Sequence, residues 1–180
     1  MKIYIDLLDD EFREVFPAAM FNLKREVEDY VLPKMVDTPH HAGLIGMAYT
    51  QIAIEETMKL SRTIAEFSYS DEDNEDGFVQ AKMGRFTVEL KVDEAIENIE
   101  KNFDEENQVD HMLRYAGEEG KSLRAAYDGF NKAEFKPVFM THVRKALRGL
   151  EAQIWEHITS RLKEILIVVE PMQNITVGKF

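Results

Sequence analysis

The longest hydrophobic pattern in the chain lies between Glu134 and Glu170. Lys136-Pro137-Val138 is a suitable helix start, because proline is tolerated in the first turn of a helix. Apolar residues then recur every three or four positions, at Val143, Leu147, Leu150, Ile154, Ile158, Leu162 and Ile165. This period predicts one amphipathic helix of about seven turns. The run from Ile165 to Val169 is rich in β-branched residues and predicts a buried strand that ends the helix.

A shorter helix is predicted near the N-terminus. After a short edge strand over Lys2 to Asp6, Asp9 or Asp10 can cap a helix that continues to a stop at Pro33. Pro17 lies inside this pattern and predicts a kink or a restart after one short turn. The apolar face of this helix consists of Phe12, Phe16, Ala19, Leu23, Val27 and Tyr30.

Another helix is predicted to begin at Pro39, behind a cap at Asp37 or Thr38, and to continue to about Ile64. One face carries Ile45, Tyr49, Ile52 and Leu60 and is continued by Phe67. A second apolar face, nearly opposite, carries Met47, Ile54 and Met58. A helix with two apolar faces is typical of one placed between two layers or between two subunits.

The middle of the chain changes to a period of two. Residues 65–70 and 86–92 alternate between apolar and polar, which predicts two half-buried strands. Between them, the acidic segment 71–77 predicts a loop, and residues 78–83 predict a third strand that turns at Gly84-Arg85. A short acidic helix is predicted over residues 93–103, followed by helical pieces and turns over residues 110–131.

These elements together predict an α+β fold, with long amphipathic helices packed on a small antiparallel sheet. We expect a single domain over residues 1–180, with an acidic loop at 71–77 and a C-terminal strand and tail at 165–180. Pro171 is expected to interrupt the pairing, because it has no N–H, and residues 174–177 to resume it with their own sheet or with a neighbour's.

Composition excludes several classes of protein. With 44% hydrophobic and 31% charged residues, the chain can bury a sizeable core, and the lack of cysteine excludes disulfides and thiolate metal sites. The N-terminus becomes acidic within its first ten residues, and no apolar run approaches the length of about 18 residues that a membrane span needs. We therefore expect neither an export signal nor a membrane partner.

The net charge of −12 is unevenly distributed. Residues 69–110 hold 14 acids and 4 bases, whereas residues 111–180 hold 8 acids and 11 bases. Such a chain can place the acidic segment of one copy against the basic helix of the next. A solvated acidic loop without a partner is the alternative.

Glu56 is the one carboxylate predicted inside an apolar helix face, four residues from both Ile52 and Leu60. A carboxylate there must be paired or must bind a cation. The phrase Ile54-Glu55-Glu56 resembles the first half of the paired-acid motif of all-α nucleotide pyrophosphohydrolases, which bind magnesium, although Lys59 stands where that family has an acid. Glu97 and Glu100 are either its second acidic pair or a surface turn.

The other polar residues do not form a catalytic pattern. His40 and His41 point about 100° apart on a helix, and His111, His142 and His157 lack partners one turn away. We therefore predict no catalytic, cofactor or metal site. A sequence pI near 4.9 disfavours sequence-specific binding of nucleic acid, but it allows a second alternative, an acidic inhibitor that mimics nucleic acid.

Trp155 is the candidate anchor of a protein interface, because it lies beside the basic residues of the last helix and off the centre of its apolar stripe. Closing the rim of the protein's own core is the alternative role for this side chain. In the interface hypothesis, basic residues of one copy face acidic residues of the next: Arg144, Lys145 and Arg148 face Asp71, Glu72, Asp73, Glu75 and Asp76. The acids then set orientation and association rate, while Trp155 and the two-faced helix supply most of the affinity.

Two sequence phrases carry a family resemblance. Tyr115-Ala116-Gly117-Glu118-Glu119-Gly120 and Pro137-Val138-Phe139-Met140, together with the order of the predicted elements, resemble the tail-completion and neck proteins of tailed bacteriophages. The resemblance implies a non-enzymatic component that forms rings at the head-tail junction or at the tail end. It also implies a protein made in the host cytoplasm and incorporated into the virion, where its partners are copies of itself and neighbouring virion proteins.

Overall fold

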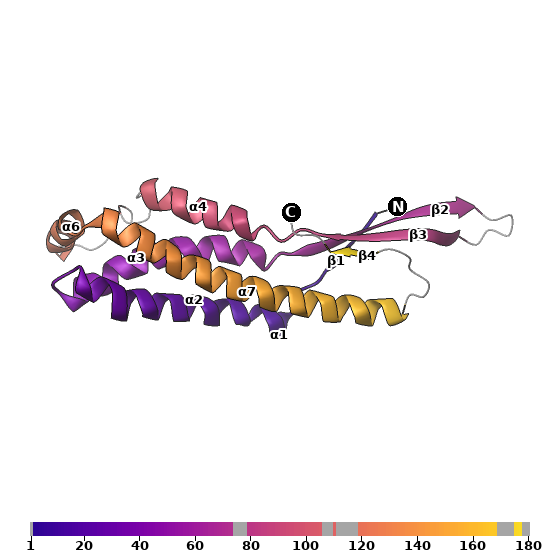
Figure 1. The fold of residues 1–180 in the computed structure, drawn as a ribbon, viewed down its shortest axis with the longest axis horizontal. Coiled ribbons are helices and arrows are strands. Elements are labelled where there is room, and N and C mark those ends of the chain that lie inside the picture. Colours follow the sequence, from indigo (N-terminus) through magenta and orange to yellow (C-terminus); the bar gives the residue numbers. More distant parts are fainter. Residues whose placement is uncertain (1, 74–78, 106–109, 111–118, 169–174, 178–180) are drawn as a thin grey trace.

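The computed structural model describes residues 2–73, 79–105, 110, 119–168 and 175–177. The molecule is elongated, with a bundle of helices at one end and a four-stranded sheet at the other (Figure 1). The fold is α+β, as the sequence predicts. No helix within the described ranges has both the length and the apolar character required to cross a membrane.

The N-terminal segment forms a strand and two consecutive helices. Strand β1 (Lys2–Asp6) precedes α1 (Asp10–Arg13) and α2 (Val15–Glu26). Asp9 caps α1, because its side chain accepts a hydrogen bond of 2.8 Å from the backbone N–H of Phe12. Pro17 lies in the first turn of α2, so the predicted restart after one short turn is confirmed.

The apolar face of α2 ends differently from the prediction. A π-helical turn, η1 (Val27–Val31), follows α2, and a 3₁₀ turn, η2 (Leu32–Lys34), follows η1. A π turn holds more residues than an α turn and therefore rotates the side chains after it. Tyr30, predicted to be buried, is 64% exposed, and Val31 is buried instead.

Helix α3 (Pro39–Leu60) begins where the sequence predicts and packs against α2 and α4 (Val92–Glu105). Its predicted core face is buried, including Tyr49 and Ile52. The helix ends at Leu60, four residues earlier than predicted. Two hydroxyl groups satisfy carbonyls of its last turn, since Ser61 Oγ donates to Met58 O and Thr63 Oγ1 donates to Leu60 O, both at 2.6 Å.

The sheet has the strand order β1-β2-β3-β4. Strands β2 (Ile64–Asp73) and β3 (Val79–Val88) form a long antiparallel hairpin, β1 pairs antiparallel with β2, and β4 (Ile175–Val177) pairs parallel with β3. The predicted return of residues 174–177 to their own sheet is confirmed over Ile175–Val177, but this parallel strand makes the sheet mixed rather than antiparallel.

Three details of the predicted strands are wrong. Asp71, Glu72 and Asp73, predicted in a loop, belong to β2, because a register shift after Ser70 lets the acidic residues continue the ladder. Gly84 and Arg85 do not form a turn, since they lie inside β3 and pair with Tyr69 and Ser68 of β2. The strand predicted to reach residue 92 ends at Val88, because Val92 already begins α4.

Helix α7 (Lys132–Val168) follows α6 (Glu119–Gly129) and is the longest described element. The predicted start at Lys136-Pro137-Val138 is wrong, because the helix begins four residues earlier and Pro137 lies inside it. Asn131 caps this earlier start, since its Oδ1 accepts a hydrogen bond of 3.1 Å from the backbone N–H of Glu134. The strand predicted over residues 165–169 is wrong for Ile165 to Val168, which are helical. The apolar period of α7 continues through Leu162 and Ile165, and extending an existing helix is easier than starting a new element. Val169 and Pro171 lie outside the described residues.

The core lies where α3, α4 and α7 meet. Ile96, Ile99 and Phe103 are buried on the predicted side of α4. The ring of Phe103 stacks on Tyr49 with 4.4 Å between ring centroids, and Phe135 and Phe139 of α7 pack around the same pair. This aromatic cluster fixes α4 against α7 and thereby positions the charged residues between these two helices.

Candidate association surfaces

The predicted basic flank of α7 faces another part of the same protomer. Arg144 Nη2 lies 3.6 Å from Glu100 Oε2, and Arg148 contacts Asp93, so both arginines pair with acids of α4. Arg148 Nη1 also donates to Glu151 Oε2 at 2.8 Å. Two of the three cations predicted for an interface between copies are therefore already paired within the protomer.

Glu151 makes the Arg148 contact important for the fold. This carboxylate is only 5% exposed, and Arg148 compensates its charge. The pKa of Arg148 is raised, first by its hydrogen bond to Glu151 and then by that to Asp93. A buried acid with a charged hydrogen-bond partner stabilises the arrangement of both groups.

Trp155 lies on the same flank of α7 and is half-buried against the hydrophobic core. Its indole Nε1 is buried and has no hydrogen-bond partner among the described residues. Indole has a large apolar surface and one donor, which usually finds a partner when buried. The position fits the rim of the protein's own core, the alternative role predicted for this residue.

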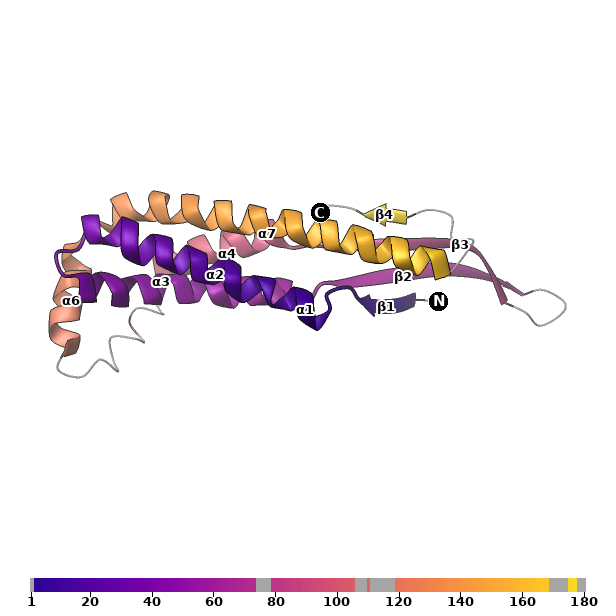
Figure 2. The same ribbon diagram turned by 90° about the horizontal axis from the view of Figure 1, so that it is seen from below.

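The acidic segment lies far along the molecule from these cations. Asp71, Glu72 and Asp73 occupy the outer end of β2, opposite residues 79–81 of β3. This end of the hairpin extends past the end of α7 in both ribbon views (Figures 1 and 2). Glu75 and Asp76 lie outside the described residues. Within the described residues, one protomer therefore does not bring Asp71, Glu72 and Asp73 to the basic flank.

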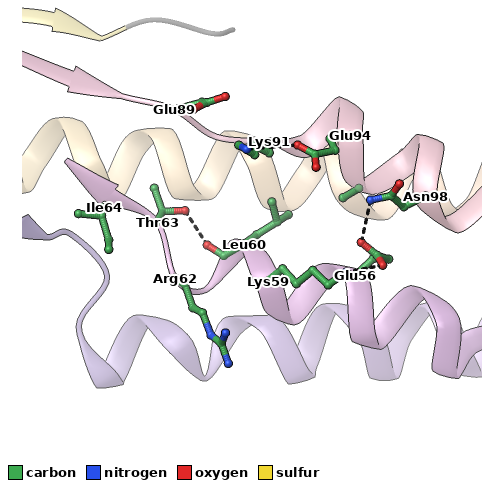
Figure 3. A pocket seen from close by; sticks show the side chains of 11 residues that line it. Glu56, Lys59, Leu60, Arg62, Thr63, Ile64, Glu89, Lys91, Glu94 and Asn98 are labelled. Carbon is green, nitrogen blue, oxygen red and sulfur yellow. Dashed lines mark hydrogen bonds and ion pairs between the residues drawn. The ribbon is translucent and has the colours of Figure 1, made fainter. Parts of the chain in front are cut away.

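Glu56 lines a cavity of about 220 Å³ between the end of α3, the start of α4 and the base of the hairpin (Figure 3). The residue is 7% exposed. Lys59 Nζ donates to Glu56 Oε1 at 2.7 Å, and Asn98 Nδ2 donates to Glu56 Oε2 at 3.3 Å. The expected need for a partner is thus met by two side chains of the protein itself.

The charges around this cavity balance each other. Three acids and three bases line it: Glu56, Glu89, Glu94, Lys59, Arg62 and Lys91. Lys91 and Glu94 are 3.5 Å apart. Among the described residues, no group of three or more histidines or acids is arranged to hold a metal ion. Of the two acids predicted as a second pair, Glu97 is exposed and Glu100 pairs with Arg144.

Two histidines have contacts that fit a structural role. His142 Nδ1 lies 2.8 Å from Glu26 Oε2 and joins α7 to α2. The ring of His157 stacks on Phe12 with 4.2 Å between centroids, and its Nε2 lies 3.4 Å from Asp9 Oδ2. His111 lies outside the described residues.

The second apolar face of α3 remains largely uncovered in the protomer. Met47 is 42% exposed, Met58 is 43% exposed, and Ile54 is half-buried. These three residues occur at intervals of seven and four positions, so they form one stripe along the helix. Methionine adapts its flexible side chain to irregular partners, which suits a contact surface.

A groove of about 300 Å³ lies between α2 and α7. Ala18 and Ala19 line it on α2, and Ala146 and Gly149 line it on α7, together with Lys145, the third predicted cation. Phe21 lies outside the groove, one turn of α2 from Ala18, and is 63% exposed. Our sequence interpretation did not identify this surface, although Phe21 lies off the apolar stripe, which was the available signal.

Comparison of the chain with known proteins gives no match to a protein-family model, to a curated protein or to a solved structure.

Proposed function

We propose that this protein is a non-enzymatic structural component that associates with copies of itself. The observation that carries this proposal is the second apolar face of α3, where Met47 and Met58 are exposed and Ile54 between them is half-buried. Burying these side chains removes apolar surface from water, which stabilises the contact by about 25 cal/mol for each Å² buried. A contiguous apolar stripe on a protein surface is typical of a site of protein contact.

The elongated shape supports the same proposal. The β2–β3 hairpin extends from the helices as an arm (Figure 1), and β1 and β4 are the two edge strands of the sheet over the described residues. Edge strands can accept a strand from a neighbouring copy. An arm and strand edges at one end, with an apolar stripe among the helices, give a protomer several surfaces for lateral contact.

The most concrete form of this proposal is a component of a bacteriophage virion at the head-tail junction or tail end. It follows from the resemblance of the two sequence phrases to tail-completion and neck proteins. In this form the protein is made in the host cytoplasm and its partners are its own copies and neighbouring virion proteins. In this form we expect no membrane partner and no sequence-specific binding of nucleic acid.

The paired state of Glu56 does not favour the hydrolase alternative. A catalytic magnesium site needs carboxylate oxygens that are available to the ion. Glu56 instead accepts hydrogen bonds from Lys59 and Asn98 on its two oxygens. That alternative also requires an all-α protein, whereas this fold contains a sheet.

Sedimentation velocity over a range of concentrations tests the proposal. We expect the mass of the wild-type protein to rise with concentration, and the double variant Met47→Ser/Met58→Ser to weaken association about tenfold or more. Val138→Ser is the matched control, because Val138 is a 36% exposed apolar residue on a different helix. Closed rings in electron micrographs would support the virion form.

Two results would contradict this proposal. A strict monomer at every concentration contradicts self-association. Magnesium-dependent release of pyrophosphate by that monomer, abolished in Glu56→Gln, would establish the hydrolase alternative instead.

A further inference from the structure

Helix α2 carries a row of four exposed residues: Glu14, Ala18, Phe21 and Arg25. Their intervals of four, three and four positions place them on one face of a helix. Glu14 precedes the helix as its N-cap residue and has helical dihedral angles, φ −67° and ψ −18°, so it continues the row. The row therefore has an acid at its start, a base at its end, and a small and a large apolar residue between them.

Phe21 has no role in the core of its own protomer. The buried residues of α2 are Phe16, Met20 and Leu23, which lie on a different side of the helix. An exposed phenyl ring leaves a large apolar surface in water, and an aromatic side chain buries about 150–250 Å² when it is covered. Contact with a second molecule would remove this surface from water.

We propose that α2 packs antiparallel against α2 of a second copy, related by a two-fold axis. The pair Ala18 and Phe21 and the pair Glu14 and Arg25 share one midpoint, between Ala19 and Met20. Antiparallel packing about that midpoint places Phe21 over the partner's Ala18. It also places Glu14 beside the partner's Arg25. This charged contact lies about 8 Å along the helix from the two-fold axis, because the rise is 1.5 Å per residue. The symmetry repeats each contact.

The groove between α2 and α7 accommodates the ring of Phe21. Ala18 lies on its rim, so Phe21 of the partner reaches the space that Ala146 and Gly149 leave open. Gly149 has nothing within 4 Å of the position where a Cβ would be. A glycine inside a helix costs about 1 kcal/mol relative to alanine, and no contact with the described residues requires it here. Close approach of the partner's ring gives this glycine a function.

The charges select antiparallel over parallel packing. Within the part of the chain that the structure describes, neither Glu14 nor Arg25 forms an ion pair. Both charges also interact favourably with the dipole of α2, so they do not by themselves require a partner. In a parallel pair, however, Glu14 would face Glu14 and Arg25 would face Arg25. Opposite charges meet only in the antiparallel arrangement.

This contact rests on the proposed self-association, but it uses a different helix from the α3 stripe. Its test is therefore separate. Sedimentation equilibrium of Phe21→Ser should show a dimer dissociation constant raised about tenfold or more. Tyr30→Ser is the matched control, because Tyr30 is equally exposed but lies outside the row, and it should associate like the wild type.

A charge exchange tests the direction of packing. Glu14→Arg should weaken the dimer, because two arginines then meet at each end of the contact. The double variant Glu14→Arg/Arg25→Glu should restore it, because the opposite charges meet again with their positions exchanged.

A single cysteine tests the symmetry. The chain contains no cysteine, so Ala18→Cys introduces one thiol near the two-fold axis. An added oxidant should link two copies of this variant covalently, whereas Ser160→Cys, an exposed site on α7 outside the row, should not link them.

The outcomes separate the two proposals. If Phe21→Ser and Tyr30→Ser both associate like the wild type while Met47→Ser/Met58→Ser does not, the two-fold contact is wrong and the α3 contact stands. If the wild-type protein is monomeric at every concentration, both proposals are wrong.

Discussion

Both flanks of α7 carry basic residues, but the two flanks have different surroundings in the structure. The flank that faces α4 carries Arg144 and Arg148, whose charges meet acids of that helix. The flank that faces α2 carries Lys145 and Gly149 and lines an open groove. On α7, the flank with two arginines therefore belongs to a contact within the protomer, whereas small residues of the other flank border open space.

The α4 flank is occupied because the two helices run antiparallel with matched charges. Three ion pairs join the two helices, and the acids along α4 pair with the bases along α7 in reverse order of sequence. The pairs are Asp93 with Arg148, Glu100 with Arg144, and Asp104 with Lys136. Lys136 Nζ lies 2.6 Å from Asp104 Oδ2. This ladder of pairs fixes the register between α4 and α7.

The largest effect is expected from Arg148→Ala, which would break the contrast by removing a charged partner of Glu151 on the occupied flank. Glu151 is buried, so the loss of its charged partner should lower the free energy of unfolding by about 1–3 kcal/mol. Urea denaturation measures this change. Arg144→Ala is the control and should cost at most about 1 kcal/mol, because both members of its pair are more than 40% exposed. Equal losses in the two variants would contradict a special role for Glu151.

A smaller effect of opposite sign is expected on the open flank. Gly149→Ala should raise the free energy of unfolding by about 0.5–1 kcal/mol, because alanine favours the helix and meets nothing within 4 Å. Gly46→Ala is the control inside the bundle, where a Cβ would lie 2.6 Å from Glu28 Cγ, so this variant should be destabilised. Thermal unfolding of both variants, at a concentration where the wild type is monomeric, measures the difference. Destabilisation by Gly149→Ala under these conditions would show that the groove is needed by the protomer itself.

The elements of the bundle could be predicted because they depend on local patterns. Helix starts at Asp9 and Pro39, the core face of α3 and the strand β1 all follow from caps and periods. The positions that failed depend on neighbours. Tyr30 is exposed because a π turn rotates it. The run after Ile165 continues the helix although its residues favour strands.

The predicted site shows the same limit. A sequence shows that residues 144–148 are rich in bases, but only the packing of α4 shows that two of these bases are paired. Glu56 could be identified as a carboxylate in need of a partner, yet its partner Asn98 lies 42 residues away and no local pattern indicates it. Phe21 lies off the apolar stripe of its helix, but only the packing of the protomer shows that its ring is left exposed.

Glu28 sharpens the comparison, because it is a largely buried acid without the kind of partner that Glu151 has. Its Oε1 has no hydrogen-bond partner among the described residues, and Lys24 Nζ lies 3.9 Å away. The pKa of Glu28 is raised above 4.5 by burial, against a smaller lowering by Lys24. A raised pKa means that the folded protein binds the proton of this carboxyl more tightly than the unfolded chain does. The resulting contribution to stability is fully present below pH 4.5 and is lost as pH rises through the pKa of the folded state.

Glu28→Gln should therefore raise the melting temperature at neutral pH and have little effect below pH 4.5, where the wild-type side chain is already neutral. The gain should correspond to less than about 1 kcal/mol, because the side chain is partly solvated and the substitution also removes the attraction to Lys24. Melting curves over a pH series measure it. A gain that is independent of pH would mean that ionisation of Glu28 does not cause the effect.

The smallest effect concerns the contact between the acidic segment of one copy and the basic flank of another. Arg144 and Arg148 already pair with α4, whereas Lys145 forms no ion pair within the described ranges. An exposed pair contributes about 0–1 kcal/mol and is screened beyond about 8 Å at physiological ionic strength. Lys145→Ala and Asp71→Asn/Asp73→Asn should therefore weaken association slightly at low salt and not at all at high salt. Trp155→Ala should instead lower the stability of the protomer, because its ring packs on the core. Association that is equal in wild type and in both charge variants at low salt would remove this contact and leave the apolar surfaces of α2 and α3 as the sources of affinity.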